Sequence, residues 1–222
     1  MCELAIVIPT LNERSNVKVL VSRLEAALRS IDWEVIFVDD DSPDGTWDVA
    51  WQIGASQRNV RCLRRVDRRG LSSACVEGML SSGAKYLAVM DADLQHDERL
   101  LLEMLETIRT GQYDIVVGSR FLGLSTSVEG LSSARERMSR IGNWISRRVC
   151  RADLSDPLSG FFMLRRECLN EIVYNLSSID SKSLSTFSPV RRVLWLSPNC
   201  LSLSASVNTE KVSLTPSSSP IF

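Results

Sequence analysis

The chain has 222 residues and a nearly balanced charge, with 26 Lys and Arg residues against 27 Asp and Glu residues. This length suits one sizeable domain with a substantial core and leaves room for an appended segment. The net charge of -1 gives no general attraction to nucleic acid, so we expect no nucleic-acid partner, and a charged ligand must meet a local patch.

The cysteines and the apolar segments bear on where the chain works. Six cysteines are scattered without a C-x-x-C pair, which predicts reduced and mostly buried thiols. The start Met1-Cys2-Glu3 shows no signal peptide, and no stretch reaches the roughly 18 consecutive apolar residues of a spanning helix. We therefore expect a cytoplasmic chain whose contact with a membrane is peripheral.

Short continuous apolar runs alternate with stretches of helical period. Runs at 4–8, 33–38, 60–63, 86–90 and 115–117 predict strands buried on both faces. Two helical stripes lie between them, one formed by Val17, Leu20, Val21, Leu24 and Leu28 and the other by Leu100, Leu101, Met104, Leu105 and Ile108. This alternation predicts an α/β fold with a mostly parallel sheet.

Polar loops follow three of the predicted strands, at 9–13, 39–45 and 91–93. Ligands bind at the carboxyl ends of the strands in such sheets, so we expect these loops to converge on one edge. The acidic run also has a structural interpretation as a solvated turn. We favour that interpretation for Asp44 and Gly45, which would shape the turn before a helix at Thr46.

The segment Asp91-Ala-Asp93-Leu-Gln95-His96 places two carboxylates directly after a buried strand. Residues i and i+2 of an extended segment point the same way, so Asp91 and Asp93 can share one hard divalent cation. Such cations often keep substrate phosphates among their ligands. The pattern indicates an enzyme that acts on a phosphate-bearing donor.

Later segments differ in character. The Gly- and Ser-rich range 122–131 predicts a mobile loop, and the helix predicted after it carries an apolar stripe beside six arginines. That helix either lies on an anionic surface or packs normally with a solvated basic face. From about Val173 the chain is Ser-rich without a period, and we expect no regular structure there.

Six ordered blocks between Leu4 and Tyr174 form a specific pattern. They are Ile8-Pro-Thr-Leu-Asn-Glu13, Val38-Asp-Asp-Asp-Ser-Pro-Asp-Gly-Thr46, Gly70-Leu-Ser-Ser-Ala-Cys-Val-Glu-Gly78, Met90-Asp-Ala-Asp-Leu-Gln-His96, Gly118-Ser-Arg-Phe121 and Asp156-Pro-Leu-Ser-Gly-Phe-Phe-Met163. Together they resemble the inverting glycosyltransferases of family 2, and within that family the dolichol- or polyprenol-phosphate mannose synthase group. The resemblance implies a GT-A fold, a Rossmann-like nucleotide-diphosphosugar transferase domain, over 1–175, followed by an atypical tail over 176–222.

The resemblance also implies a donor site. Asp91, Asp93 and Gln95 would hold Mg²⁺ or Mn²⁺ against the donor diphosphate, with Ala92 beside the donor. The residues that would line the nucleotide pocket are Pro9, Leu11, Glu13, Val38 and Asp40, of which Asp40 would contact the base or ribose. Leu11 stands where Tyr is frequent in the family, so one stacking contact is weaker.

An acceptor site is implied further along the chain. Arg120, Arg135 and Ser139 resemble the groups that grip the donor phosphate and the lipid phosphate, a task that suits the planar fork of Arg. Arg135 and Ser139 are four residues apart and so share a helix face. A surface ion pair is the alternative for Arg120. We expect His96, the only histidine, to order the metal loop or begin the next helix rather than to act as a base.

The implied reaction moves mannose from GDP-mannose to a polyprenyl or dolichyl phosphate at the cytoplasmic membrane face. A lipid phosphate oxygen attacks the sugar C1, and the nucleoside diphosphate leaves beside the metal. Two alternatives stay open: a UDP-glucose or UDP-N-acetylhexosamine donor, and an inactive remnant. A separate membrane-anchoring subunit also stays open as a partner. A dinucleotide redox enzyme is disfavoured, because Pro9-Thr-Leu-Asn12 stands where a Gly-x-Gly-x-x-Gly would follow the first strand.

The sequence departs from the family after Ile179. The helix and the later Gly-Glu-Ser-Lys segment of the family do not appear, yet Asp180 to Ser188 admits codons that spell Leu-Lys-Ile-Leu-Val-Asp-Leu-Leu when shifted by one nucleotide. We hypothesise a frameshift near Ile179 that removes a phosphate-gripping Lys and leaves Asp180 to Phe222 without native structure.

Overall fold

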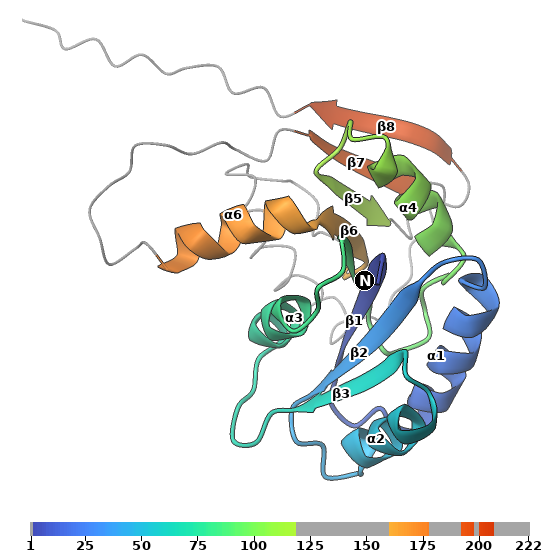
Figure 1. The fold of residues 1–222 in the computed structure, drawn as a ribbon, viewed down its shortest axis with the longest axis vertical. Coiled ribbons are helices and arrows are strands. Elements are labelled where there is room, and N and C mark those ends of the chain that lie inside the picture. The colour runs from blue at the N-terminus through green and yellow to red at the C-terminus, as the bar shows by residue number, and fades with distance from the viewer. Residues whose placement is uncertain (1, 119–159, 178–191, 198–199, 207–222) are drawn as a thin grey trace, which may run out of the picture.

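The computed structural model describes residues 2–118, 160–177, 192–197 and 200–206. The elements in chain order are β1 (Leu4–Thr10), α1 (Arg14–Ala27), β2 (Trp33–Asp39), α2 (Thr46–Ser56), β3 (Val60–Arg64), α3 (Leu71–Leu80), β4 (Tyr86–Val89), α4 (Leu100–Arg109), β5 (Ile115–Gly118), β6 (Phe162–Arg165), α6 (Arg166–Ser177), β7 (Arg192–Ser197) and β8 (Cys200–Ser206). They form an 8-stranded sheet with helices on both of its faces (Figure 1).

The strand order in the sheet is β3-β2-β1-β4-β6-β5-β7-β8. The pairs β1–β2, β1–β4, β2–β3 and β5–β7 are parallel, whereas β4–β6, β5–β6 and β7–β8 are antiparallel. The predicted α/β fold with a mostly parallel sheet is confirmed.

The apolar runs become strands because both faces of the sheet are covered. Along β1 the side chains alternate between two cores, with Leu4, Ile6 and Ile8 in one and Ala5 and Val7 in the other. Helices α1, α2 and α4 cover the first face, and α3 and α6 cover the second, as the ribbon shows (Figure 1). A strand that is buried on both faces has no exposed position for a polar side chain, which explains why these runs are continuously apolar.

The helical stripes also lie where the sequence predicts them. Both stripes are buried in the first core over their whole length. Helix α1 ends at Ala27, and the backbone N–H of Leu28, its C-cap residue, donates to the Leu24 carbonyl at 2.9 Å.

Three strands were not predicted from the sequence. Strand β6 enters from a remote part of the chain and fills the space between β4 and β5. Strands β7 and β8 lie within the Ser-rich range for which we expected no regular structure, and β7 takes the edge of β5. The sequence Arg192-Val-Leu-Trp-Leu196 is a short apolar run of the kind that such an edge accepts. The division into 1–175 and 176–222, and the frameshift, remain predictions.

The cysteines of the described part are free, as expected. Cys75 and Cys168 are buried, and Cys2 and Cys62 are partly buried. Burial raises the pKa of the Cys62 thiol to about 12, and it also raises that of Cys75. Thiols with such pKa values stay protonated and unreactive near neutral pH.

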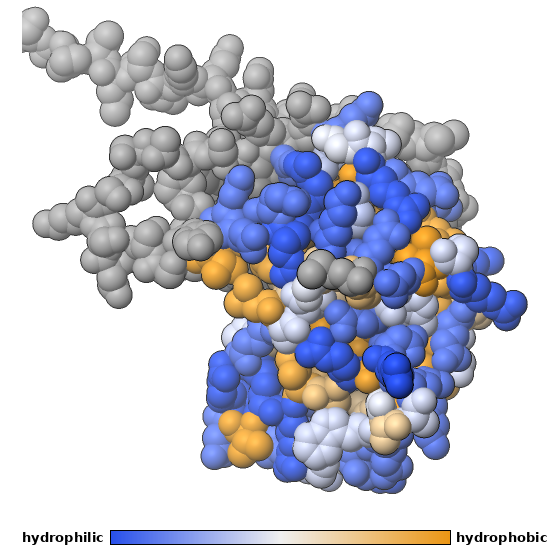
Figure 2. All heavy atoms as spheres, viewed as in Figure 1, coloured by the Kyte–Doolittle hydropathy of each residue, from blue (hydrophilic) through white to orange (hydrophobic). Residues whose placement is uncertain are grey.

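Hydrophilic residues predominate on the described surface that Figure 2 shows, with hydrophobic residues in separate patches. The exposed large hydrophobic side chains of the described residues belong to Leu11, Val19, Trp51, Val66 and Leu80. Among the helices described, none combines the length and the apolar character that crossing a bilayer requires. The predicted loop at 122–131 and the basic helix after it lie outside the described residues.

Candidate functional site

The loops after β1 and β2 meet at the carboxyl edge of the sheet. The backbone N–H groups of Asn12 and Glu13 donate to the hydroxyls of Ser42 and Thr46, each at 2.9 Å. The Asp40 N–H donates to the Thr10 carbonyl at 3.2 Å. Strand β4 lies on the other side of β1, so the loop that begins at Asp91 leaves the same edge. The predicted convergence of the three loops is therefore found in the fold.

Most of the acidic run stabilises the loop itself. Asp39 is fully buried and accepts hydrogen bonds from the Thr10 hydroxyl at 2.8 Å and from the Ser42 N–H and hydroxyl at 2.7 Å. Asp41 accepts from Arg64 Nε at 2.6 Å. These contacts fix the shape of the turn. The carboxylate of Asp40 makes none of them.

Asp44 and Gly45 have the structural role that the sequence favours. Asp44 accepts hydrogen bonds from the Thr46 N–H at 3.0 Å and the Thr46 hydroxyl at 2.6 Å, so it stabilises the turn that leads into α2, whose N-cap residue is Gly45. Burial by itself would raise the pKa of Asp44, but the hydrogen bonds from Thr46 and Arg14 together lower it. Gly45 has φ +81°, in the left-handed region that glycine tolerates.

Asp40 is almost buried beneath the loop that joins β3 to α3. Its Oδ2 accepts a hydrogen bond from the Gly70 N–H at 2.8 Å, and its Oδ1 lies 3.4 Å from Arg65 Nη1. Sequence reasoning missed Arg65, because Arg64-Arg-Val-Asp-Arg-Arg69 reads as a charged solvated loop. The glycine at position 70 was the available sequence signal, because glycine tolerates unusual backbone angles. In the structure its φ is +137°, and its N–H donates to the Asp40 carboxylate.

The other predicted nucleotide-pocket residues lie along the same edge. Pro9 and Val38 are paired in the register of β1 and β2. Leu11 is 43% exposed, and Glu13 accepts a hydrogen bond from Asn16 Nδ2 at 2.7 Å. The Val38 side chain is fully buried in the second core, so its expected place in the lining of a pocket is not seen, whereas Leu11 is open to a ligand.

The acidic loop after β4 turns sharply at Leu94, which has φ +61°. Asp91 and Asp93 are partly exposed, Ala92 is buried, and Gln95 is exposed. The Gln95 N–H donates to Asp93 Oδ1 at 3.1 Å. The turn therefore brings all three residues implied as metal ligands into one short loop.

His96 and the segment before β6 support this loop from beneath. The His96 side chain is 2% exposed, and its Nε2 lies 3.4 Å from Asp91 Oδ2. Its ring packs against Phe161 with 4.8 Å between centroids. A Cβ added to Gly160 would lie 2.8 Å from Asp91 Oδ1 and 2.9 Å from its Cγ, so a larger residue at this position would displace the carboxylate.

The donor chemistry of the loop suits a hard divalent cation. Two carboxylates and an amide oxygen, from Asp91, Asp93 and Gln95, are ligand types that Mg²⁺ and Mn²⁺ accept, and both cations share their coordination with phosphate oxygens. Within the described residues, no three His, Cys, Asp or Glu side chains stand together as a complete metal cage. The ligand types present in the loop therefore fit a hard divalent cation.

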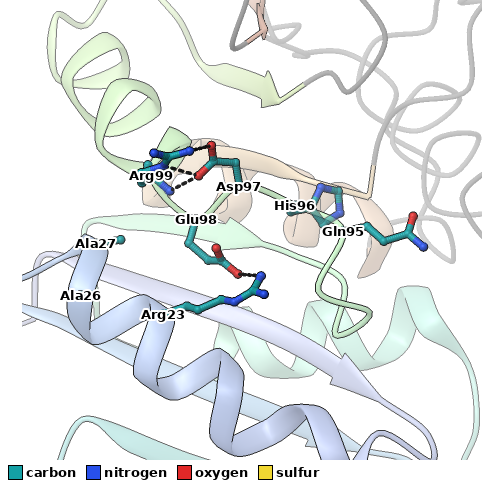
Figure 3. Close-up of a pocket in the computed structure, with 8 residues that line it drawn as sticks. All are labelled: Arg23, Ala26, Ala27, Gln95, His96, Asp97, Glu98 and Arg99. Atoms are coloured by element: carbon teal, nitrogen blue, oxygen red, sulfur yellow. Dashed lines mark hydrogen bonds and ion pairs between the residues drawn. The ribbon is translucent and has the colours of Figure 1, made fainter.

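A pocket of about 530 Å³ lies behind the acidic loop, against α1. Its lining residues are Arg23, Ala26, Ala27, Gln95, His96, Asp97, Glu98 and Arg99 (Figure 3). Arg23 forms an ion pair with Glu98 at 3.4 Å, and Arg99 forms one with Asp97 at 2.8 Å. Figure 3 shows the Gln95 side chain pointing away from Arg23 and Glu98. The two ion pairs therefore contribute to the wall of the pocket that lies between the loop and α1.

The residues implied for phosphate and acceptor binding, Arg120, Arg135 and Ser139, lie outside the described residues. Their roles remain predictions.

Comparison with known families identifies the fold that carries this site. The model of the family described as "Glycosyl transferase family 2" matches residues 5–173. This chain belongs to glycosyl transferase family 2. The family contains transferases, and the GT-A fold expected for them agrees with the sheet described above.

Curated members of the family are similar to this chain over most of its length. A dolichol-phosphate mannosyltransferase of Pyrococcus furiosus is 37% identical over 78% of the chain and 49% of its own length. A protein of the same name from Saccharomyces cerevisiae is 32% identical over 75% and 62%. A polyprenol monophosphomannose synthase of Mycolicibacterium smegmatis is 33% identical over 80% and 66%. The chain spans about half to two thirds of these relatives.

Two solved structures agree with this chain at the level of architecture. Glucosyl-3-phosphoglycerate synthase of Mycobacterium tuberculosis, in complex with Mn²⁺, UDP and phosphoglyceric acid, has a TM-score of 0.55 at 14% identity, over 88% of this chain and 68% of its own. A mannosyltransferase of Pyrobaculum calidifontis, in complex with GDP-Man and Mn²⁺, has a TM-score of 0.53 at 15% identity, over 77% and 46%. At these identities the likeness establishes the GT-A fold.

Proposed function

We propose that this family 2 chain transfers mannose from GDP-mannose to a polyprenyl or dolichyl phosphate in a metal-dependent, inverting reaction. The observation that carries the proposal is the acidic loop 91–95, which leaves the carboxyl edge of β4 beside the loops after β1 and β2. The curated relatives at 32–37% identity, which are named as dolichol-phosphate or polyprenol mannose transferases, support the choice of sugar and acceptor.

Asp91, Asp93 and Gln95 would hold Mg²⁺ or Mn²⁺. When bound, the cation would neutralise charge on the donor diphosphate as it leaves. His96 and Gly160 would keep the Asp91 carboxylate in place through the contacts described above. Asp40 would accept a hydrogen bond from the base or ribose, with Pro9, Leu11, Glu13 and Ala92 lining the donor pocket.

The chemical step is a displacement at the sugar C1. A bond forms between C1 and an oxygen of the lipid phosphate, and the bond from C1 to the diphosphate oxygen breaks, so the nucleoside diphosphate leaves with the electron pair. A phosphate nucleophile is already ionised near neutral pH, so no general base is required. Arg120, Arg135 and Ser139 would orient the two phosphate groups, and catalysis would rest on positioning and electrostatic stabilisation.

The proposed site of action is the cytoplasmic face of a membrane, because the acceptor is a lipid. The contact would be peripheral, through the basic helix predicted after residue 131 or through a separate anchoring subunit.

A donor panel tests the proposal. The purified chain is supplied with polyprenyl phosphate in vesicles, with GDP-mannose, UDP-glucose or UDP-N-acetylglucosamine, and with Mg²⁺, Mn²⁺ or chelator. We expect lipid-linked product from GDP-mannose only, and none with chelator. Turnover with UDP-sugars alone would overturn the donor assignment, and full turnover in chelator would overturn the role of the cation.

A second candidate is a remnant that binds nucleotide sugar without turnover. It is favoured by the Ser-rich sequence after Ile179, which replaces the helix and the Lys segment of the family. Calorimetry with GDP and Mn²⁺ beside the turnover assay separates the two, since binding without product favours the remnant.

A further inference from the structure

A buried ion pair lies next to the proposed donor site. It joins Asp40, at the end of β2, to Arg65, at the end of β3, with 3.4 Å between Oδ1 and Nη1. The two side chains are 11% and 4% exposed. Charges removed from water to this degree are costly unless their geometry is complete, so the surroundings of this pair are informative.

Arg65 is held mainly through its two terminal nitrogens. Its Nη1 donates to the Gly70 carbonyl at 3.2 Å, and its Nη2 donates to the Ser73 hydroxyl at 2.8 Å. Its Nε is buried without a hydrogen-bond partner among the described residues and lies 3.7 Å from Glu77 Oε2. Gly70, Ser73 and Glu77 belong to the start and middle of α3, so the position of the guanidinium is set by that helix and the loop before it.

Asp40 is held less completely. Its Oδ2 accepts the Gly70 N–H at 2.8 Å, which is a full hydrogen bond. Its Oδ1 is buried and accepts no hydrogen bond from the described residues, although Arg65 lies close to it. A buried carboxylate oxygen without a hydrogen bond is costly, and a ligand that donates a hydrogen bond to it would remove that cost.

We infer that Arg65 is a positioning residue for recognition of the donor's base. The inference rests on the proposed function, which places the nucleotide at this edge. Arg65 and Gly70 together fix the Asp40 carboxylate so that Oδ1 accepts a hydrogen bond from an imino N–H of the base. Because the guanidinium is engaged by Gly70, Ser73 and Glu77, it acts through Asp40 and does not itself read the base.

The chemistry of the bases turns this geometry into a preference. Guanine presents N1–H and an amino group, and uracil presents N3–H, so each can donate to a carboxylate. Adenine has an unprotonated ring nitrogen at the equivalent place, which a carboxylate repels. A well-positioned Asp40 therefore favours GDP or UDP over ADP.

The test measures binding of GDP, UDP and ADP with Mn²⁺ to the full chain by calorimetry, with thermal unfolding in parallel. The preference is the ratio of the Kd for ADP to the Kd for GDP or UDP, whichever of these two binds more tightly. For Arg65→Gln we expect this ratio to fall about tenfold or more, as for loss of a well-aligned hydrogen bond to a charged group. Affinity for ADP should change less than about twofold. Arg65→Lys, which keeps the charge but not the fork, should restore part of the preference.

Two further variants keep the test decisive if Arg65→Gln does not fold. Ser73→Ala removes the 2.8 Å contact to Nη2 and the hydrogen bond from the Ser73 hydroxyl to the Gly70 carbonyl at 2.9 Å, and should lower the preference in the same direction by about threefold. Arg61→Gln is the matched control, because Arg61 pairs with Glu34 at 3.0 Å, is 40% exposed and contacts neither Asp40 nor the groups that hold Arg65, so it should leave the preference unchanged.

The outcomes are distinguishable. An unchanged preference in folded Arg65→Gln, or in Ser73→Ala where Arg65→Gln is unfolded, overturns the role of Arg65. Equal binding of the three nucleotides by the unaltered chain also overturns it, while the proposed function stands. If the chain binds none of them, the proposed function falls and this inference falls with it.

Discussion

The partly exposed carboxylate of Asp93 is the clearest single-residue test of the proposed metal site. Asp93→Asn removes the charge that would bind the cation but keeps an acceptor for the Gln95 N–H. We expect metal-dependent turnover to fall by about a hundredfold or more, while the thermal unfolding midpoint stays close to that of the unaltered chain.

The matched control for Asp93→Asn is Asp97→Asn. Asp97 lies in the same segment but pairs with Arg99, so its loss should leave turnover nearly unchanged. Undiminished turnover in Asp93→Asn would remove Asp93 from the proposed site.

Gly160 is a second residue on which the acidic loop depends. In Gly160→Ala the new Cβ meets the Asp91 carboxylate, so that side chain must move. We expect Mn²⁺ affinity in the presence of GDP to fall at least about tenfold, which calorimetry measures.

Gly111→Ala is the control for added volume, because a Cβ there meets nothing within 4 Å. Because Gly111 has a φ of +72°, alanine at this position should lower the stability of the chain without changing its Mn²⁺ affinity. Equal Mn²⁺ affinity in Gly160→Ala and the unaltered chain would show that Asp91 does not depend on this glycine.

Asp44 gives a prediction for stability against pH. Its pKa is lower in the folded chain than the ordinary value of 3.8, so its stabilisation is present above that pH and is lost as the pH falls through the folded value. Asp44→Ala removes the hydrogen bonds to Thr46 at the start of α2 and should cost about 1 kcal/mol in the free energy of unfolding at pH 7.

Urea unfolding at pH 7 and at about pH 3 checks the Asp44 prediction, since the difference between the two chains should shrink at the lower pH. Asp44→Asn keeps an acceptor oxygen and should cost less than Asp44→Ala at pH 7. A cost that is the same at both pH values would contradict the role of the ionised carboxylate.

At the scale of elements, Arg166 joins α6 to the end of α3. Its guanidinium donates to the carbonyls of Met79 and Ala84 at 3.0 Å and of Ser82 at 2.9 Å. Burial lowers the pKa of Arg166, and the three carbonyls offset that cost by accepting its N–H groups. Arg166→Ala leaves them without this donor, and we expect a loss of about 2–3 kcal/mol in the free energy of unfolding.

Arg109→Ala is the matched control at this scale. Arg109 pairs with Glu3 on the surface, where the two side chains are 40% and 33% exposed, so its loss should cost less than about 1 kcal/mol. Denaturant unfolding measures both variants, and equal costs would contradict the bridging role of Arg166.

The elements that local sequence determines were predictable, and those that depend on distant pairing were not. The first five strands and the stripes of α1 and α4 follow from apolar runs and helical period. Strand β6 has no such signal, because Phe162–Arg165 is a short run whose position between β4 and β5 is decided by antiparallel pairing far along the chain.

The same division holds for the candidate site. Convergence of the three loops follows from the parallel strands, and the family resemblance supplied the ligand roles. Arg65 was missed because its burial depends on contacts with Gly70, Ser73 and Glu77, which the run of charged residues around it does not reveal. Residues 119–159, which hold Arg120, Arg135 and Ser139, lie outside the described residues, so their roles rest on the resemblance alone.

At the scale of the whole molecule, the reading frame after Ile179 decides how the chain compares with its family. We predict that a chain restored to the neighbouring frame from Asp180 turns over GDP-mannose at least about tenfold faster, because it regains the phosphate-gripping Lys. Parallel assays of both chains measure the difference. A stop codon or family-unlike sequence in the neighbouring frame would refute the frameshift.

The central position of β6 has a consequence for how the protein is made. β5 ends at Gly118, whereas β6 begins at Phe162, so the ribosome must add more than forty residues before the middle of the sheet can close. Until then β4 and β5 expose unpaired edges, and Asp91 lacks Gly160 as its neighbour. The proposed metal site would therefore be completed late in synthesis, and we expect a nascent chain stalled before residue 160 to be the species most exposed to misassociation.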